Sequence, residues 1–499
     1  MRIEDTLIEE KNAGKTFTCI DDHGIWDKSS IITMAYSLKI VLENKNISHL
    51  DRVVILCENG VSFLVAILGV LLAGAIAVPI DPQMPYELIQ YAVNNVKAKV
   101  ACISGTNSIR KIEDHYKRTD MDGFEFLFEK MGDWQVKSDI HSYLGKYSSE
   151  NDPAFILFSS GTTGAAKGVV LTHKAILNNV KAIIEYMNPT SNDTFYISKT
   201  MAHASTLTGE VVVSLMAGAK LICKNPLVSP KTVLKRIESL KPSIICVNPT
   251  ILRLILRAKQ GKNDLSSIRL LYTSGDVADK KLLLEAQNMF SHSRILNVYG
   301  LTEAGPRVTA QRCGDEINYG SVGRPIKGVN VIVRDKNGIV CKPDEIGTIF
   351  VKTSSLMLGY WEDYTATNKK IICGELKTDD LGYVDEAGEL YVLGRADDMI
   401  IRGAHNIDPC RVENIVRKIP GIDNCVIFGI PDELNGKRLV CAFEKEENHA
   451  VSKKDIISHC SRFLLPYEIP QELYEWSKIP TTSSGKISRH LAARYYMNM

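Results

Sequence analysis

The stretch AFILFSSGTTGAAKGVVLTH, residues 154–173, decides the fold of this chain. It opens with the apolar run 154–159, which predicts a buried strand, and it closes at Thr172, which suits the N-cap of a helix. After Thr172, apolar residues follow the spacing of one helix face. A loop rich in glycine and hydroxyl groups lies between strand and helix. This order indicates an anion-binding turn in an α/β domain.

The loop itself, residues 159–168, combines three glycines, four hydroxyl side chains and one lysine. Glycine lets the backbone turn sharply and approach an anion, and the other groups add donors. This chemistry suits a polyphosphate, although the order of a Walker A loop is absent. A plain flexible turn is the alternative, which so specialised a composition disfavours. The residues expected to bind nucleotide are Ser159, Ser160, Gly161, Thr162, Thr163, Gly164 and Lys167.

Apolar runs that alternate with helical patterns extend this α/β pattern along the chain. The expected buried strands are 53–57, 99–104, 154–159, 220–223, 243–247 and 270–275. Strands alternating with helices predict helix-covered, mostly parallel sheets. A chain of 499 residues is too long for one compact core, so we expect two or three.

The pattern changes after about residue 320, where strand–turn–strand segments carry DKNG and DEAG turns and predict a β-rich subdomain. After Arg395 a smaller unit begins. Its first helix is expected at Asp408 and Pro409, as N-cap and first helical residue. The sequence therefore predicts a large N-terminal body, residues 1–396, and a small, mobile α+β C-terminal domain, residues 397–499.

Composition narrows the class of protein. The net charge of +2, without a block of like charge, argues against nucleic-acid binding. The 12 cysteines stand singly, which predicts reduced thiols in the cytoplasm and no zinc site. The apolar run Val61–Ile80 is interrupted by Gly69, Gly74 and Pro79. We therefore interpret it as a buried helix and a short strand rather than a transmembrane segment.

Three further motifs follow the loop along the chain: NVYGLTE (297–303), TDDLGY with GRADD (378–383 and 394–398) and PTTSSGKI (480–487). With SSGTTGAAKG they resemble, in order, the core motifs of the adenylate-forming superfamily. That superfamily includes acyl-CoA synthetases, peptide-synthetase adenylation domains and luciferases. The chain is most similar to AMP-forming acyl-CoA synthetases.

Two of these motifs have physical meaning of their own. Tyr299 offers a flat face for adenine, and Glu303 is a hard oxygen ligand suited to Mg²⁺. Asp380 and Arg395 are expected near the open end of one hairpin. There they could bind a ribose diol or form a salt bridge with each other, and the geometry of a hairpin does not choose between these. The resemblance favours ribose.

The resemblance also assigns roles by position. Lys486 would neutralise charge between the carboxylate and the α-phosphate, Thr302 would donate to that phosphate, and His203 would lie at the acyl pocket. Asp397 would be the hinge of a rotating C-terminal domain, with Arg402 and Gly403 at the thiol tunnel. The expected metal ligands are Thr163 and Glu303. The remaining nucleotide contacts are Ser274, Gly275, Asp276, Asn297, Tyr299, Gly300, Thr302, Asp380 and Arg395.

The function that the resemblance implies is an AMP-forming ligase of a carboxylic acid and a thiol. It would use ATP and Mg²⁺, and CoA or the phosphopantetheine of an acyl or peptidyl carrier protein. The assembly is expected to be a monomer or homodimer. The alternatives are an adenylating ligase with an amine acceptor and a catalytically silent acyl- or nucleotide-binding homologue.

Four positions depart from the family pattern. Asp379 stands where glycine is usual, Thr200 where proline is common, Ala404 for a frequent glycine and Arg411 for a frequent glutamate. Arg411 would be at the third helical position after Asp408, where the positive helix end disfavours a cation. We expect either a compensating acid or a contact with an anion, such as the phosphates of a thiol carrier.

Overall fold

The computed structural model describes most of the chain. The described residues are 2–8, 17–84, 86–104, 125–127, 149–159, 167–226, 228–258, 263–275, 278, 280–312, 318–395, 400–402, 405–432, 436–446, 449–481 and 487–499. These residues separate into two compact units. The first unit is Met1–Val331 with Val351–Lys377, and the second is Ile332–Phe350 with Thr378–Met499. Each unit is described here by itself.

A seven-stranded sheet in the first unit carries the segment 154–173. Its order is β18 (Gly359–Tyr360), β8 (Lys167–Thr172), β7 (Pro153–Ser159), β4 (Ile76–Pro79), β3 (Arg52–Cys57), β5 (Val100–Ser104) and β6 (Glu125–Leu127). The strands from β7 to β6 are parallel, whereas β7–β8 and β8–β18 are antiparallel. The predicted strands at 53–57, 99–104 and 154–159 are therefore confirmed.

A nine-stranded sheet forms the other layer of parallel strands in this unit. Its order is β15 (Arg324–Pro325), β14 (Arg307–Ala310), β13 (Arg294–Gly300), β12 (Leu270–Thr273), β11 (Ile244–Val247), β9 (Thr194–Ile197), β10 (Lys220–Ile222), β1 (Thr18–Ile20) and β2 (Ile25–Asp27). The strands from β13 to β1 are parallel, and β14, β15 and β2 are antiparallel edges. The mostly parallel α/β body is thus confirmed.

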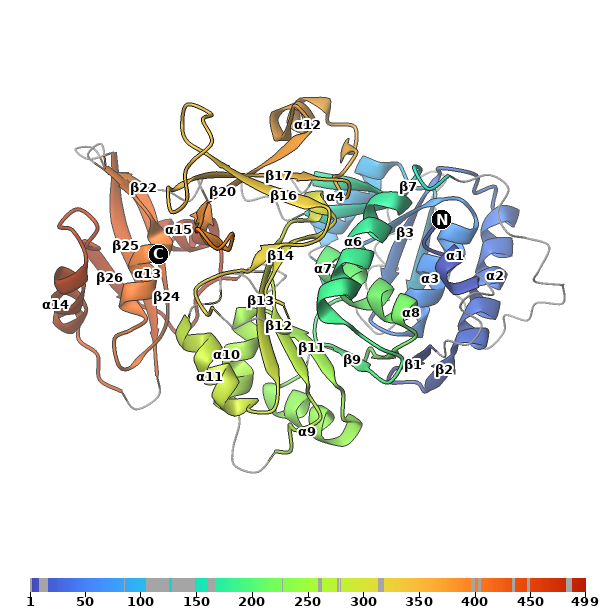
Figure 1. The fold of residues 1–499 in the computed structure, drawn as a ribbon, viewed down its shortest axis with the longest axis horizontal. Coiled ribbons are helices and arrows are strands. Elements are labelled where there is room, and N and C mark those ends of the chain that lie inside the picture. The colour runs from blue at the N-terminus through green and yellow to red at the C-terminus, as the bar shows by residue number, and fades with distance from the viewer. Residues whose placement is uncertain are drawn as a thin grey trace. The chain divides into compact units, whose positions relative to one another are not determined.

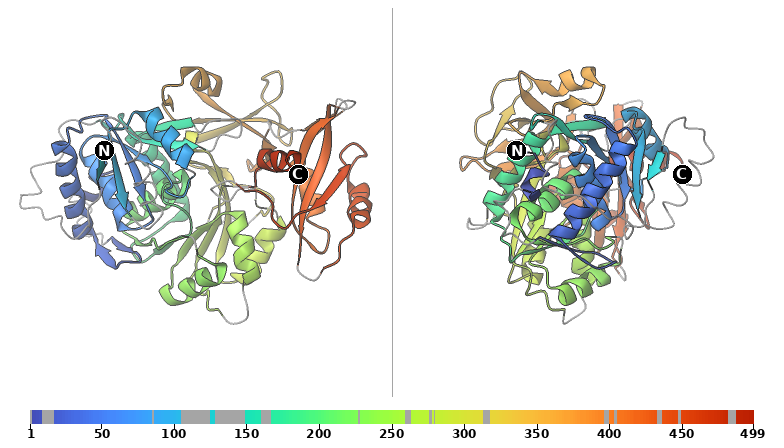
Figure 2. Two further views of the ribbon diagram at one scale, coloured as in Figure 1. Left: turned by 180° about the vertical axis from the view of Figure 1, so that it is seen from behind. Right: turned by 90° about the vertical axis from the view of Figure 1, so that its right-hand side faces the viewer.

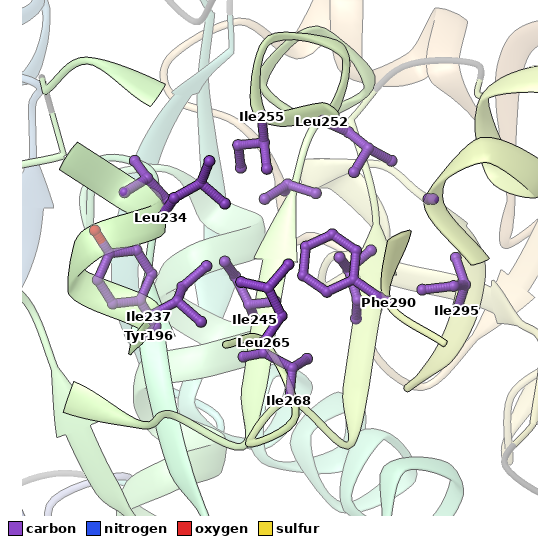
Figure 3. Packing of buried hydrophobic residues seen from close by; sticks show 14 of the residues in the cluster. Tyr196, Leu234, Ile237, Ile245, Leu252, Ile255, Leu265, Ile268, Phe290 and Ile295 are labelled. Carbon is purple, nitrogen blue, oxygen red and sulfur yellow. The ribbon is translucent and has the colours of Figure 1, made fainter. Parts of the chain in front are cut away.

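Helices cover these sheets. They are α1 (Asp5–Ile8), α2 (Lys28–Asn44), α3 (Val61–Leu72), α4 (Tyr86–Val96), α6 (His173–Met187), α7 (Ala204–Thr206), a π-helical segment (Leu207–Val212), α8 (Val213–Ala217), α9 (Pro230–Leu240), α10 (Pro249–Ala258), α11 (Lys280–Met289), a 3₁₀ turn (Thr302–Ala304) and α12 (Tyr364–Lys370). Helices α9, α10 and α11 lie together beside the nine-stranded sheet (Figure 1). Figure 3 shows their core, in which Leu234, Ile255 and Ile245 pack in one cluster.

The long apolar run forms the helix and strand that its punctuation predicts. Helix α3 is buried along nearly its whole length, and β4 follows after Gly74, whose φ is +71°. Helix α2 packs along α3, as the blue helices in Figure 2 show. None of the helices within the described ranges has both the length and the apolar character needed to cross a membrane.

One sequence expectation at the phosphate loop was wrong. The loop does not lead directly into a helix, because the segment Lys167–Thr172 forms strand β8 and returns antiparallel beside β7. Helix α6 begins only after this strand, with the Thr172 side chain accepting from the Ala175 N–H at 3.0 Å. The sequence of β8 is short and apolar, so the pattern alone does not distinguish this strand from the first turns of a helix. The loop therefore closes a hairpin whose ends, Ser159 and Lys167, are register partners.

The second unit contains mostly antiparallel strands, one parallel pair (β25 with β26) and three helices among its described residues. A five-stranded sheet runs β16 (Val329–Arg334), β17 (Gly347–Thr353), β20 (Glu375–Val384) and β19 (Ile371–Ile372), with β21 (Leu390–Arg395) beside β20. Strand β19 belongs to the segment Val351–Lys377 of the first unit. The other elements are β22 (Ile400–Arg402), β23 (His405–Ile407), α13 (Pro409–Val416), β24 (Ile422–Asp432), β25 (Gly436–Lys445), α14 (Lys453–Phe463), β26 (Glu472–Glu475) and α15 (Arg489–Met497). The strands of the predicted β-rich subdomain and the helices and strands of the predicted small α+β domain are therefore confirmed.

The predicted start of the C-terminal helix is also confirmed. The Asp408 side chain accepts from the Cys410 N–H at 2.9 Å, and Pro409 opens α13. The predicted domain boundary at residues 396 and 397 falls inside the second compact unit. The predicted boundary separates a fixed segment from a rotating one. The division into compact units does not test rotation, so the boundary stays a prediction. The predicted hinge residue, Asp397, lies outside the described residues.

Candidate functional site

The carboxyl ends of three parallel strands, β9, β12 and β13, bring the first group of predicted site residues to one edge of the nine-stranded sheet. Strands β9, β11, β12 and β13 are neighbours (Figure 1). The predicted residue His203 follows β9, as does Lys199, which the sequence did not single out. Ser274 follows β12, and Thr302 and Glu303 follow β13. Ligands of open α/β sheets bind outside such carboxyl ends. The topology therefore marks this edge as a candidate binding site.

Glu303 is held at this edge by a tyrosine that the sequence did not single out. The Tyr360 hydroxyl donates to Glu303 Oε1 at 2.8 Å. Lys167 Nζ lies 5.0 Å from the centroid of the same ring, a cation–π contact. Tyr360 reaches this position because β18 pairs with β8, opposite Val169. The structure thus brings Lys167 and Glu303 to one aromatic ring.

The turn between β13 and the 3₁₀ segment requires a residue without a side chain. A Cβ on Gly300 would lie 1.9 Å from the Pro306 carbonyl oxygen, a contact that backbone cannot relieve cheaply. The register between β13 and β14 shifts at Tyr299 and Gly300. Gly300 therefore lets the returning strand approach closely and places Thr302 and Glu303 at the end of β13. The assigned ligand roles of Tyr299 and Thr302 stay predictions.

Asn297 lies beneath the turn and is buried. Its Nδ2 donates to the Ser321 carbonyl at 3.1 Å, and its Oδ1 accepts from the Thr273 hydroxyl at 3.3 Å. Its backbone N–H donates to Gln311 Oε1 at 2.8 Å. These bonds tie β13 to β12 and to the chain before β15. The placement makes Asn297 a positioning residue, and a direct nucleotide contact stays a prediction.

His203 lies beyond β9 and caps the short helix α7. Its Nδ1 accepts from the Ser205 backbone N–H at 3.2 Å and lies 2.9 Å from the Ser205 hydroxyl. A ring nitrogen that accepts from a backbone N–H carries no proton there, so the neutral ring has its proton on Nε2. The acyl-pocket role of His203 stays a prediction.

Lys199 is at the centre of a buried polar cluster beside His203. Its ammonium lies 3.1 Å from Cys246 Sγ, 3.3 Å from the Ser274 hydroxyl and 3.4 Å from the Glu210 carboxylate. Burial lowers the pKa of Lys199, whereas Cys246 and Glu210 raise it, and the contacts prevail. The amide of Asn59 fixes the Lys199 backbone from the other sheet, by a 2.7 Å bond to the Lys199 carbonyl. No motif in the sequence indicates this cluster, because Cys246 and Ser274 lie 47 and 75 residues from Lys199 along the chain.

The loop after β12 carries two more predicted residues. Ser274 is buried and Gly275 has a φ of +98°, in the left-handed region that favours glycine. A sharp turn directly after a parallel strand fits the predicted packing of this loop on adenine. That contact stays a prediction.

Asp380 and Arg395 lie in the second unit, as direct register partners on β20 and β21. Asp380 is 6 % exposed, and its N–H donates to the Thr378 hydroxyl at 3.0 Å. The predicted pairing on one hairpin is confirmed. The neighbouring Asp379 has a φ of +63°, which explains why glycine is usual there and why aspartate, which tolerates this region, can replace it.

Two other residues of the second unit have identified partners. Arg402 Nη1 donates to the Tyr467 carbonyl at 2.8 Å. Arg411 Nη1 lies 3.3 Å from the buried carboxylate of Glu468, so an acid compensates its place in the first turn of α13. The predicted residues outside the described ranges are Ser160, Gly161, Thr162, Thr163, Gly164, Asp276, Asp397, Gly403 and Lys486.

The family follows from comparison with known proteins. The model of the AMP-binding enzymes matches residues 38–361, and that of their C-terminal domain matches residues 411–486. A long-chain-fatty-acid–CoA ligase of Mycobacterium tuberculosis, FadD13, is 26 % identical over 493 residues, covering 94 % of each chain. The oxalate–CoA ligase of Saccharomyces cerevisiae is 25 % identical over 476 residues, covering 89 % of this chain and 87 % of its own.

Solved structures agree with the fold. ATP-bound MatB from Rhodopseudomonas palustris superposes with a TM-score of 0.91 at 21 % identity, covering 99 % of both chains. The anthranilate CoA ligase AuaEII with anthranoyl-AMP superposes with a TM-score of 0.90 at 22 % identity, covering 100 % of this chain and 98 % of its own. With the family models covering both parts of the chain, this protein belongs to the AMP-binding enzymes.

Proposed function

We propose that this protein is an AMP-forming ligase that activates a carboxylic acid as its adenylate and transfers the acyl group to a thiol. The observation that carries the proposal is the meeting of Lys167 and Glu303 at the Tyr360 ring. A cation from the phosphate loop and a hard carboxylate converge beside the carboxyl ends of the parallel strands. This is the pair of groups that a polyphosphate with its metal needs.

In the first half-reaction the acid's carboxylate oxygen attacks the α-phosphorus of ATP. The new bond is oxygen to phosphorus, and the bond to the β-phosphate bridge breaks, so pyrophosphate leaves with both electrons. Lys167 and the loop would hold the phosphates, and Thr302 would donate to the α-phosphate. Lys486 would stabilise the charge that develops as two anions meet.

The donor set at Glu303 fits a magnesium ion. Oε1 accepts from Tyr360, which fixes the carboxylate and leaves its second oxygen for a ligand. Mg²⁺ is commonly held by one or two carboxylates together with substrate phosphates. Glu303 and Thr163 would hold it, and when bound it would neutralise phosphate charge.

We assign the ribose to Asp380 and Arg395, which support this role by their adjacent positions on β20 and β21. In the second half-reaction a thiolate attacks the acyl carbon, a thioester forms and AMP leaves. Rotation of residues 397–499 about Asp397 would withdraw Lys486 and bring Arg402 and Gly403 to the site.

We propose CoA as the acceptor, because the relatives compared above are named as CoA ligases. A carrier-protein phosphopantetheine and an amine are the other acceptors, and a catalytically silent homologue is the non-enzymatic alternative. The proposed location is the cytoplasm, and the proposed assembly is a monomer or homodimer.

The proposal is tested by incubating the protein with ATP, Mg²⁺ and a panel of acids, and then adding CoA, carrier protein or amine separately. Acid-dependent AMP formation followed by thioester formation with CoA supports the proposal. AMP formation followed by acyl transfer only to an amine would show that the acceptor is an amine and not CoA. An absence of AMP with every acid would refute the enzymatic function.

A further inference from the structure

Three charged side chains, Lys199, Glu210 and Arg307, form a buried cluster at the edge of the nine-stranded sheet. The side chains of Lys199 and Glu210 are 12 % and 1 % exposed and lie 3.4 Å apart. Arg307, the first residue of β14, is 3 % exposed. The inference below rests on the proposed function, because it concerns the acid that the site activates.

The guanidinium of Arg307 has fewer hydrogen-bond acceptors among the described residues than it has N–H donors. Its Cζ lies 5.2 Å from the centroid of the Tyr272 ring, and the Tyr272 hydroxyl is directed to the Gly209 carbonyl at 3.4 Å. Nη2 is buried and donates no hydrogen bond to any described residue. A Cβ on Gly209 would approach this nitrogen to 3.0 Å, so the π-helical segment leaves just enough room for it. Buried donors of this kind need a partner.

The charges of the cluster do not balance. Among the described titratable groups near Arg307 are Tyr186, Tyr272, Cys246, Lys199 and one carboxylic acid, Glu210. Burial raises the pKa of the Cys246 thiol, which disfavours a thiolate there. Among the described residues of this cluster, two cations therefore face one carboxylate, that of Glu210. An uncompensated buried charge is costly, which favours an anion from outside the chain.

The cluster adjoins the predicted acid pocket. Lys199 contacts Ser274 at 3.3 Å and Ser205 at 3.4 Å, and Ser205 in turn contacts His203. Arg307 follows Pro306 in the segment that begins with Gly300 and Glu303. An acid whose reacting carboxylate points to the phosphates would extend its other end toward these cations.

We propose that the acid activated by this protein carries a second carboxylate, which Arg307 and Lys199 bind. The planar guanidinium matches a carboxylate by two parallel hydrogen bonds, and the ammonium adds a charge. The substrate class is therefore a dicarboxylic acid rather than a long-chain or unsubstituted acid. Glu210 positions Lys199 for this contact.

The wild-type protein tests the proposal with acids matched in chain length. Pyrophosphate release is measured with malonate and propionate, succinate and butyrate, glutarate and valerate, and adipate and hexanoate, with palmitate and benzoate added. The best dicarboxylate should exceed its matched monocarboxylate at least about 100-fold in kcat/KM. A monocarboxylate lacks the second carboxylate and would leave the buried donors of Arg307 and Lys199 unpaired. Equal or better turnover of monocarboxylates would overturn the inference and leave the proposed function standing. No turnover of any acid would overturn the function itself.

Variants assign the preference to its residues. Arg307→Leu and Lys199→Met should each reduce the ratio of dicarboxylate to monocarboxylate kcat/KM at least about 10-fold, and Arg307→Lys should retain more of the ratio than Arg307→Leu. Arg324→Leu, at an exposed arginine on the neighbouring β15, is the control and should keep the ratio. An equal fall with both classes of acid would indicate a merely structural cluster and overturn the assignment. If Arg307→Leu does not fold, the ratio of dicarboxylate to monocarboxylate kcat/KM in Lys199→Met tests the assignment.

Discussion

The hydroxyl of Tyr360 donates a 2.8 Å hydrogen bond to Oε1 of Glu303, and the ring of Tyr360 supports the Lys167 ammonium at 5.0 Å. One side chain on the edge strand β18 therefore orients two groups that the proposed reaction needs. Tyr360 is 57 residues from Glu303 along the chain. The contact brings the edge of the seven-stranded sheet to the proposed active site.

Replacing Tyr360 by phenylalanine should remove the hydrogen bond to Glu303 while keeping the ring beneath Lys167. A hydrogen bond to a charged group contributes about 1.5 kcal/mol, so kcat/KM for adenylation should fall about tenfold. The measurement is pyrophosphate release at saturating ATP with varied Mg²⁺. The Mg²⁺ dependence should shift to higher concentration, because the carboxylate is less well oriented.

Tyr474→Phe is the matched control for this variant. The Tyr474 hydroxyl also donates to a glutamate, Glu472 at 2.9 Å, outside the candidate site. Its adenylation rate should remain that of the unchanged protein. If Tyr360→Phe kept full activity and the same Mg²⁺ dependence, Tyr360 would not position Glu303.

Lys486→Ala should nearly abolish adenylation and spare the second half-reaction. Removing a cation aimed at developing charge costs on the order of 100- to 1,000-fold in rate. Thioester formation from pre-made acyl-adenylate should continue, because that step does not bring a carboxylate to a phosphate. Single-turnover kinetics of each half-reaction measures this, and an equal loss in both would refute the assigned role.

Asp397→Pro tests the prediction that Asp397 is the hinge residue. Proline fixes φ and should hold one arrangement of the C-terminal domain. Adenylation should be retained, and thioester formation should fall at least about 10-fold, because the domain motion gates the second step. Quenched-flow measurement of both products separates the steps. An undiminished second step would argue against rotation about this residue.

The N-terminal segment should show a pH-dependent stability that one substitution removes. Glu4 is 1 % exposed and lies 3.3 Å from Arg2. Burial raises the pKa of Glu4 from 4.5 to about 7. His173, 3.5 Å from Glu4, is neutral, because burial lowers its pKa from 6.5 to about 4, and its Nδ1 accepts from the Ile3 N–H at 3.3 Å.

The sign follows from these directions. The contribution of Glu4 is fully present below pH 4.5 and is lost as the pH rises through about 7, up to about 3 kcal/mol. That of His173 is present above pH 6.5 and is lost as the pH falls through about 4. The free energy of unfolding should therefore fall between pH 5 and 8 in the unchanged protein, and Glu4→Gln should abolish this fall. Urea unfolding at each pH measures it. Parallel pH profiles of both proteins would show that Glu4 is not buried as described.

Local patterns in the sequence predicted the elements well where periodicity and punctuation agreed. The run Val61–Ile80 contains a glycine stop and a terminal proline, which together marked the end of α3 and the strand β4. The DEAG turn placed Asp380 and Arg395 on one hairpin, because the register of a hairpin follows from its turn. Asp408 and Pro409 marked α13 by their capping chemistry.

The contacts that depend on sheet order could not be predicted in this way. Strand β8 was missed because six residues of mixed apolar sequence fit a strand or a helix start equally well. Tyr360 meets Glu303 only because β18 pairs with β8. Arg307, on β14, comes near Lys199 and Glu210 because β14 belongs to the same sheet as β9, although about a hundred residues separate these strands in the sequence. No residue spacing encodes such meetings.

The central claim is that the α-phosphorus of ATP is attacked by a carboxylate at this site. Acid-dependent exchange of labelled pyrophosphate into ATP, without CoA, tests it most directly, with Glu303→Gln as the comparison. The account predicts exchange that requires both an acid and Mg²⁺ and that falls at least about 100-fold in Glu303→Gln. Exchange independent of any acid, or no exchange across mono- and dicarboxylic acids in folded protein, would contradict it.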